Sequence, residues 1–467
     1  EYRDLGMISD HKSLTLRIRR PFFLKNPNRS GHQRDQRFLL KNLVLHFRPR
    51  TVPERTLKFT LSWGLGGTAL VLVFLLAATG VMLRFVYIPV PDQAYESIQN
   101  LQHEIRFGQL IRNIHHWSGN VLVLVSFLHL LRIFFSGAFH PPRQLNWVIG
   151  ICLFVLILMS NFTGYLLPWD QLAFWAITIC TGMVEYIPGI GLWLQKMMRG
   201  GAEINPATLA NFFAIHTAVL PLCMLLCLPF HFWRIRKAGG LVVPRTAEEP
   251  IEKIGDRVPT VPNLLLRELV VALVVIAIVL IFSVLVNAPL EQKANPGVSP
   301  NPTKAPWYFM GLQELLLHFH PVVAVVFIPA LTMMMLIGLP YINYDSNTSG
   351  IWFSSPKGRR LAVMSALAAA TVTPFAILAD EYFIDFTAWL PAIPAVISNG
   401  LIPFGLLLSV FIGVYYFLKH KFAASVNEAI QAIFTALIVA FMVLSATGIW
   451  FRGKGMALVW PWNLGGP

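Results

Sequence analysis

Charged side chains are scarce in this chain of 467 residues. Asp, Glu, Lys and Arg together make up only 13% of it, whereas soluble domains carry about 25%. An ordinary water-soluble domain is therefore excluded. Cysteine is scarce as well, and the four that occur lack the spacing of a disulfide framework or a metal site. We expect them to be buried packing residues inside apolar stretches: Cys152, Cys180, Cys223 and Cys227.

Apolar residues take the place of the missing charge. They make up 55% of the chain and gather in runs long enough to cross the hydrocarbon core of a bilayer. The first run begins only near Phe59, so no secretory signal is expected ahead of it. We predict an all-α integral membrane protein with about nine transmembrane helices, at residues 61–88, 114–136, 147–168, 210–233, 266–287, 320–342, 361–379, 400–418 and 429–450.

The formal net charge of +14 is compatible with a nucleic-acid partner, but its distribution indicates a membrane instead. Most Lys and Arg residues fall in the segments that nine spans place on one side: 1–60, 137–146, 234–265, 343–360 and 419–428. Few fall in the segments on the other side: 89–113, 169–209, 288–319, 380–399 and the tail after Trp450. Because cytoplasmic loops carry the excess of Lys and Arg, we expect a cytoplasmic N-terminus in a bacterial inner membrane, with lipid and no nucleic acid around the chain.

Four histidines lie inside apolar spans, where ionisable side chains are costly and usually functional. His115 and His129 belong to the second predicted span, and His216 and His231 to the fourth. At about 100° per residue, steps of 14 and 15 residues return to within about 40° and 60° of the same helix face, and they cover about 21–23 Å along the axis. Two such helices side by side supply two bis-imidazole sites, as two haems require. The alternative is that the four histidines merely pack within the bundle.

Glycines repeat at the same step in the neighbouring spans. Gly66 and Gly80 are 14 residues apart in the first span, and so are Gly150 and Gly164 in the third. A porphyrin between helices needs the flanking backbones close to its face, which glycine permits. The alternative is ordinary small-residue helix packing, which is common in membranes. The shared step favours the haem interpretation.

Arginines lie one helical turn from two of the histidines. Arg112 precedes His115 by three residues, and Arg132 follows His129 by three. Their guanidinium groups are placed to pair with haem propionates near either membrane surface, although interfacial snorkelling explains the same positions. His116 adjoins His115 but does not keep the 14-residue step to His129, so His115 is the predicted ligand.

Longer motifs point to a family. Residues 60–240 contain TG at 79–80, IHHW, LHLLR, GYLLPWDQ at 164–171, AIHT and HFWRIRK. In these motifs the segment resembles cytochrome b of the Rieske/cytochrome b complexes. The 15-residue step from His216 to His231 and the PWDQ motif are more similar to the chloroplast and cyanobacterial branch. Residues 264–380 resemble the second part of the family, and beyond residue 390 the resemblance is weak.

The resemblance implies a quinol-oxidising subunit with two haems. His115 and His216 would hold the haem nearer the outer face, and His129 and His231 the haem nearer the cytoplasm. Menaquinol or ubiquinol would be oxidised in an outer pocket between the loops 165–191 and 304–318, with proton release outside. The residues implied at this pocket are Trp169, Trp307 and Tyr308.

The resemblance also implies partners and a second quinone site. Electrons would leave through a Rieske iron–sulfur protein and a c-type cytochrome, in a complex expected to be dimeric. Arg236, near the cytoplasmic end of the fourth span, would meet a haem propionate or a quinone oxygen.

Two positions depart from the family pattern. The outer loop reads KAPWYFMGLQELL, so Pro306 stands where the family has a glutamate that is taken to accept a quinol proton. Glu314, His318 and His320 follow in the same segment and are the candidate replacements; the alternative for Glu314 is that it faces lipid headgroups. In the first span Gly64 occupies the place of a cysteine that binds an extra haem in the chloroplast-type branch, so both haems are expected to be non-covalent.

These observations predict an order of parts along the chain. A four-helix di-haem bundle is followed by a three-helix quinol-site unit and two extra helices. The predicted parts are a basic cytoplasmic segment 1–58, the bundle 59–238, a linker 239–263, the quinol-oxidation unit 264–380 and the added helices 381–467. Two other functions remain open: a di-haem membrane anchor of a different quinone-linked dehydrogenase, and a haem-free transporter.

Overall fold

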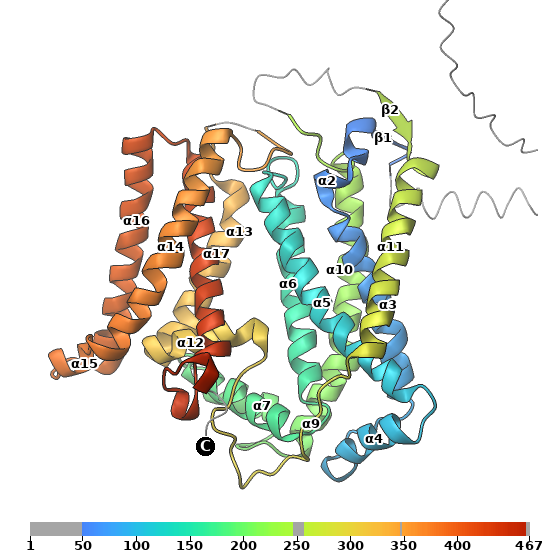
Figure 1. The fold of residues 1–467 in the computed structure, drawn as a ribbon, viewed down its shortest axis with the longest axis vertical. Coiled ribbons are helices and arrows are strands. Elements are labelled where there is room, and N and C mark those ends of the chain that lie inside the picture. The colour runs from blue at the N-terminus through green and yellow to red at the C-terminus, as the bar shows by residue number, and fades with distance from the viewer. Residues whose placement is uncertain (1–48, 246–255, 346–347, 464–467) are drawn as a thin grey trace, which may run out of the picture. The chain divides into compact units, whose positions relative to one another are not determined.

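Nine helices in the described part of the chain are long and apolar enough to cross a membrane, as predicted. The computed structural model describes residues 49–245, 256–345 and 348–463, all within the unit Phe47–Pro467. The predicted basic segment 1–58 therefore lies mostly outside the described residues. The spans are α3 (Leu65–Arg84), α5 (Gly108–Phe135), α6 (Gln144–Tyr165), α9 to α10 (Pro206–Lys237), α11 (Thr260–Leu285), α13 with its flanking turns (Val323–Tyr341), α14 (Pro356–Tyr382), α16 with the preceding turn (Ile397–Phe422) and α17 (Val426–Trp450) (Figure 1).

Three of these spans contain one turn of π-helix, and a proline follows each turn. The ring of proline removes a backbone donor and displaces the carbonyl one turn earlier, and such a disturbance is accommodated by a wider turn that takes in one extra residue. The turns and their prolines are Ile215–Val219 before Pro221, Val323–Phe327 before Pro329, and Ile397–Leu401 before Pro403.

The first four spans pack in sequence order. Helix α3 lies against α5, α5 against α6, and α6 against α10 (Figure 1). The fifth span, α11, packs on α3 and α5, so it lies beside the four-helix bundle. At the other side of the molecule α14 packs along α17, and α16 and the short helix α12 (Met310–His318) also contact α17. The added C-terminal helices therefore cover the segment that carries the outer loop.

Hydrogen bonds join the interhelical segments into two separate ends. At one end the strand β1 (Thr51–Pro53) pairs with β2 (Arg257–Pro259), and the Arg143 guanidinium donates to the carbonyls of Ala238 and Gly240. At the opposite end Asp170 bridges to Lys293, where the loop after α6 meets the loop after α11. This division agrees with the two sets of segments that the charge count separates. We call them the basic end and the opposite end.

The expectation that the cysteines are buried packing residues is wrong. All four are free thiols; Cys152 is exposed, and Cys180, Cys223 and Cys227 are only partly buried. The outward surface of a membrane bundle contacts lipid tails, which are as apolar as a protein core. An uncharged thiol is therefore accommodated on either side of such a helix.

Candidate functional site

His115 and His216 face each other across the bundle. His115 comes from α5 and His216 from the π turn between α9 and α10, and their ring centroids are 6.2 Å apart with the planes at 75°. A metal–imidazole bond is about 2 Å long, so two such bonds in line, with the distance from each nitrogen to its ring centre, come to about 6 Å. The pair is spaced to hold one metal atom between its rings.

Hydrogen bonds fix which nitrogen of each ring is free. Nδ1 of His216 lies 3.0 Å from the carbonyl oxygen of Ser160, which only accepts, so Nδ1 carries the proton. The Thr79 hydroxyl donates to the Leu75 carbonyl and therefore accepts from Nδ1 of His115 at 2.9 Å. Both Nε2 atoms are left with a lone pair and no hydrogen-bond partner among the described residues. Metal-ligating histidines commonly donate their other ring N–H to an oxygen acceptor in this way, which fixes the orientation of the ring.

The four glycines at the 14-residue step each face one of the four histidines. The nearest atom to a Cβ built on each glycine is the Cε1 of an imidazole ring. The distances are 3.3 Å from Gly66 to His129, 3.3 Å from Gly80 to His115, 3.7 Å from Gly150 to His231, and 2.6 Å from Gly164 to His216. The glycines thus provide close approach at the imidazoles, beyond general helix packing, and two of them face His129 and His231.

The π turn explains the unequal histidine steps. His216 lies within Ile215–Val219, and such a turn takes in one residue more than an α turn. The 15 residues from His216 to His231 therefore place the two rings on one face, much as 14 residues do for His115 and His129. His116, by contrast, packs edge-on against Trp117 and lies 3.3 Å from the Asn120 side chain.

The donor set fits a metal that brings ligands of its own. Among the described residues no group of three or more His, Cys, Asp or Glu side chains could hold a bare ion. Two imidazoles on opposite sides of a metal complete the coordination of a porphyrin iron. The paired histidines and the glycines opposite them therefore fit haem.

Arg112 and Arg132 differ in how many of their donors are already bonded to the protein. Arg112 donates to the carbonyls of Ala288 and Pro289 at 2.9 and 2.6 Å, so it holds the loop after α11. Arg132 donates through Nε to Leu61, while its Nη2 is buried without a partner among the described residues. That unused donor suits an anionic group such as a propionate. Arg236 lies in the last turn of α10, at the basic end.

The two outer loops meet at the opposite end. Trp169 is buried and belongs to the same hydrophobic cluster as Phe309, the residue after Tyr308. Trp307 is 43% exposed, and its indole nitrogen donates to Asn120 of α5 at 2.7 Å. Tyr308 packs against the cluster of α3, α5 and α11, where burial raises the pKa of its hydroxyl.

Glu314 is fully buried, so the alternative that it faces lipid headgroups is wrong. Its carboxylate lies 2.7 Å from Arg452 Nη2 and 3.4 Å from His318 Nε2. Burial alone would raise the pKa of Glu314, but the hydrogen bonds and charges of these two partners hold it below its ordinary value. Arg452 was not predicted from the sequence, because a single cation just after an apolar run is typical of the membrane interface.

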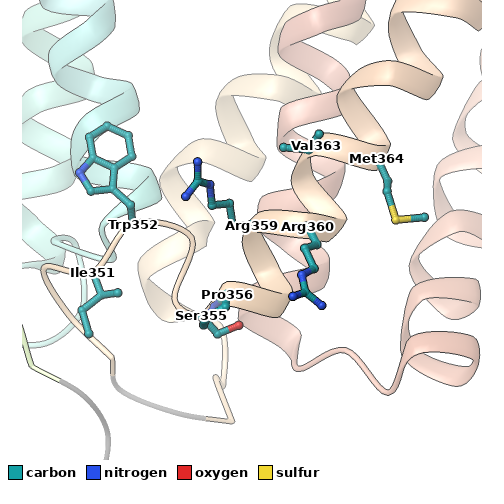
Figure 2. A pocket seen from close by; sticks show the side chains of 8 residues that line it. All are labelled: Ile351, Trp352, Ser355, Pro356, Arg359, Arg360, Val363 and Met364. Atoms are coloured by element: carbon teal, nitrogen blue, oxygen red, sulfur yellow. The ribbon is translucent and has the colours of Figure 1, made fainter.

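A cavity of about 800 Å³ lies elsewhere. Figure 2 shows it at the start of α14, where its lining includes Trp352, Arg359 and Arg360. It is at the basic end and none of its lining residues is a histidine or carboxylate. It is therefore not part of the candidate redox site.

Comparison with known proteins assigns the bundle to one group. Residues 53–239 match the family model described as cytochrome b/b6/petB. Cytochrome b6 of Heliomicrobium gestii is 42% identical over 188 residues, which are 40% of this chain and 87% of that protein. Cytochrome b6 of a Desmonostoc species is 41% identical over 175 residues, 38% of this chain and 81% of that protein.

A solved structure extends the likeness in fold beyond this matched region. A chain of a hyperthermophilic respiratory Complex III superposes with a TM-score of 0.62 at 21% identity, over 89% of this chain and 98% of that one. At this identity the likeness concerns the fold.

Proposed function

Since this chain belongs to the cytochrome b/b6 family, we propose that it is the cytochrome b subunit of a membrane complex that oxidises quinol through two non-covalent b-type haems. The observation that carries the proposal is the His115–His216 pair, 6.2 Å apart and flanked by glycines. Bound haem supplies reversible one-electron redox chemistry to the protein.

The residues of this chain have distinct tasks in the proposal. Nε2 of His115 and of His216 would hold one haem iron, and His129 and His231 would hold the other. The Thr79 hydroxyl accepts from Nδ1 of His115, and the Ser160 carbonyl accepts from Nδ1 of His216. These bonds keep Nε2 of each ring directed at the metal. The unused Nη2 of Arg132 supports a propionate partner at the basic end. Arg112 already donates to the carbonyls of Ala288 and Pro289. Its task in the proposal is therefore to hold the loop after α11.

Quinol is oxidised at the opposite end, between the loops that carry Trp169 and Trp307. Trp307 and Tyr308 line this site, and the bond from Trp307 to Asn120 places it one turn beyond His115 on α5. A haem held by His115 and His216 would therefore lie close to this site. Pro306 cannot take a proton. The role of Glu314 as acceptor stays a prediction, and its lowered pKa makes it a weak base.

The proposal also includes the membrane, the partner subunits and the site of quinone reduction. The basic end faces the cytoplasm of a bacterial inner membrane, with the opposite end outside. There one of the two quinol electrons leaves through a Rieske iron–sulfur protein and a c-type cytochrome, in a dimeric complex. Quinone is reduced at the basic end, near Arg236. The fold likeness to a respiratory Complex III supports this setting.

Replacement of the histidines tests the proposal. We expect His115→Leu or His216→Leu to remove one of two reduced haem α-bands in purified membranes, and His129→Leu or His231→Leu to remove the other. His116→Leu is the matched control, because its ring faces Trp117 and Asn120, and both bands should remain. A separate test concerns the parent chain. Because both haems are proposed to be non-covalent, a denaturing gel stained for haem should show no haem band at the mass of this subunit. Retention of both bands in all four ligand variants would contradict the assignment.

A further inference from the structure

Resting on the proposed quinol site, we propose that Arg452 is a positioning residue for that site, supplied by the segment after the last span. The matched family region ends at residue 239, so this device lies outside it. Arg452 is 1% exposed and is the largest of the fully buried side chains in the described residues. A buried guanidinium needs a complete set of partners, because an unpaired charge is very costly away from water.

Arg452 joins three elements at once. It reaches Glu314 of α12 through Nε and Nη2, at 2.7–3.2 Å, and Glu381 of α14 through Nη1 at 3.0 Å. Nη1 also donates to the carbonyl of Met456, in its own turn. His318 continues the line from Glu314 to Asp380 of α14, with its Nδ1 2.7 Å from that carboxylate. Charges of opposite sign alternate along the whole row, so each one is balanced by its neighbours.

The outer loop is fastened to the same C-terminal segment along its length. The Lys304 amine donates to the carbonyl of Ile449 at 2.8 Å, and the Gly455 N–H donates to the Asn301 side chain at 2.6 Å. Helix α12 also approaches α17 closely: a Cβ at Gly311 would lie 2.6 Å from the Phe441 ring. The segment 301–314 therefore cannot move without the C-terminal segment.

The other side of that loop touches the haem bundle. Trp307 bonds to Asn120 of α5, and Tyr308 packs into the cluster formed by α3, α5 and α11. Met310, the first residue of α12, lies between this contact and Gly448 of α17. The position of Trp307 and Tyr308 against α5 is thus set from one side by the bundle and from the other by Arg452. A small displacement of groups that bind a substrate is costly to its reaction.

The experiment compares four variants in native membranes. Arg452→Met combined with Glu314→Gln removes the pair without leaving a lone buried charge. Glu314→Gln alone is its reference, because any loss of a proton acceptor at Glu314 is then common to both variants. Arg452→Lys keeps the charge but loses the forked geometry. Lys357→Gln is the matched control, since Lys357 also bridges the α14 and α17 elements, through Glu428 at 3.2 Å, but at the basic end. The probes are a short-chain naphthoquinol and a short-chain benzoquinol, each titrated with cytochrome reduction as the readout.

Relative to Glu314→Gln, we expect the double variant to raise the KM for quinol about fivefold or more, while kcat of these two variants agrees within about twofold and both haem bands remain. Arg452→Lys should lie between the double variant and the parent, and Lys357→Gln should match the parent. A KM for the double variant equal to that of Lys357→Gln would overturn the inference. Loss of both haem bands in both Arg452 variants would also overturn it, because Arg452 would then serve assembly as a whole. Failure of the parent chain to oxidise either quinol would instead count against the proposed function.

Discussion

Among the four glycines at the 14-residue step, Gly164 is the position where a single methyl group has the largest expected effect. A Cβ there would lie 2.6 Å from Cε1 of His216, a distance that real side chains do not tolerate, whereas at Gly150 the nearest ring atom is 3.7 Å away. Overpacking of this kind typically costs about 1–3 kcal/mol. We therefore expect Gly164→Ala to displace His216 and to lower the occupancy of the haem it shares with His115. Haem content and reduced spectra of the purified variant measure this.

Gly67 of α3 controls for the substitution itself, because nothing lies within 4 Å of a Cβ built there. Gly67→Ala should keep both haem bands at parental intensity. Equal haem content in Gly164→Ala and Gly67→Ala would show that the close approach at Gly164 does not matter for cofactor binding.

At the scale of one element, α12 is held by a pair of interactions that depends on pH. His318 lies between Asp380 and Glu314, at 2.7 and 3.4 Å. Burial lowers the pKa of the His318 imidazole, but its hydrogen bonds and charge interactions with the two carboxylates outweigh this and raise it from 6.5 to about 9. A group whose pKa is higher in the folded protein stabilises the fold in full below the pKa that it has in the unfolded chain. This stabilisation is lost as the pH rises through the pKa of the folded protein.

We therefore expect the midpoint of thermal unfolding of the detergent-solubilised protein to be constant up to about pH 6.5 and to fall from there as the pH rises through about 9. The stabilisation lost is at most about 3 kcal/mol. His318→Gln should be less stable at neutral pH and should lack this step. If the parent and His318→Gln showed the same decline across that range, protonation of His318 would not be what anchors α12.

The elements that sequence could predict are those whose signal is local. Nine apolar runs give nine spans, and the 14-residue steps of histidine and glycine give the rings and the backbones that face them. The π turn around His216 was not predicted, because a proline in a helix marks a disturbance without saying what form it takes. The partners of Glu314 were not predicted either. Arg452 lies 138 residues further on, and only the packing of α12 on α17 brings the two side chains together.

At the scale of the whole molecule, the difference between the basic end and the opposite end gives any electron or proton transfer across the membrane its direction. Segments assigned to one side by their Lys and Arg content are joined to each other by hydrogen bonds, as in the pairing of β1 with β2. Those of the other side are joined likewise, as at the bridge from Asp170 to Lys293. Cytoplasmic segments carry the excess positive charge, which predicts that the basic end is inside.

Single exposed cysteines at the two ends test this orientation. Asp256 and Ser299 are both exposed, the first beside β2 at the basic end and the second in the outer loop after α11. In intact cells a membrane-impermeant maleimide should label Ser299→Cys strongly. Asp256→Cys should be labelled only after the inner membrane is opened, because the reagent must cross it to reach the cytoplasm. The parent chain, with its four native thiols, measures the background. Labelling of Asp256→Cys but not of Ser299→Cys in intact cells would invert the orientation, and the proposed quinol site would then face the cytoplasm.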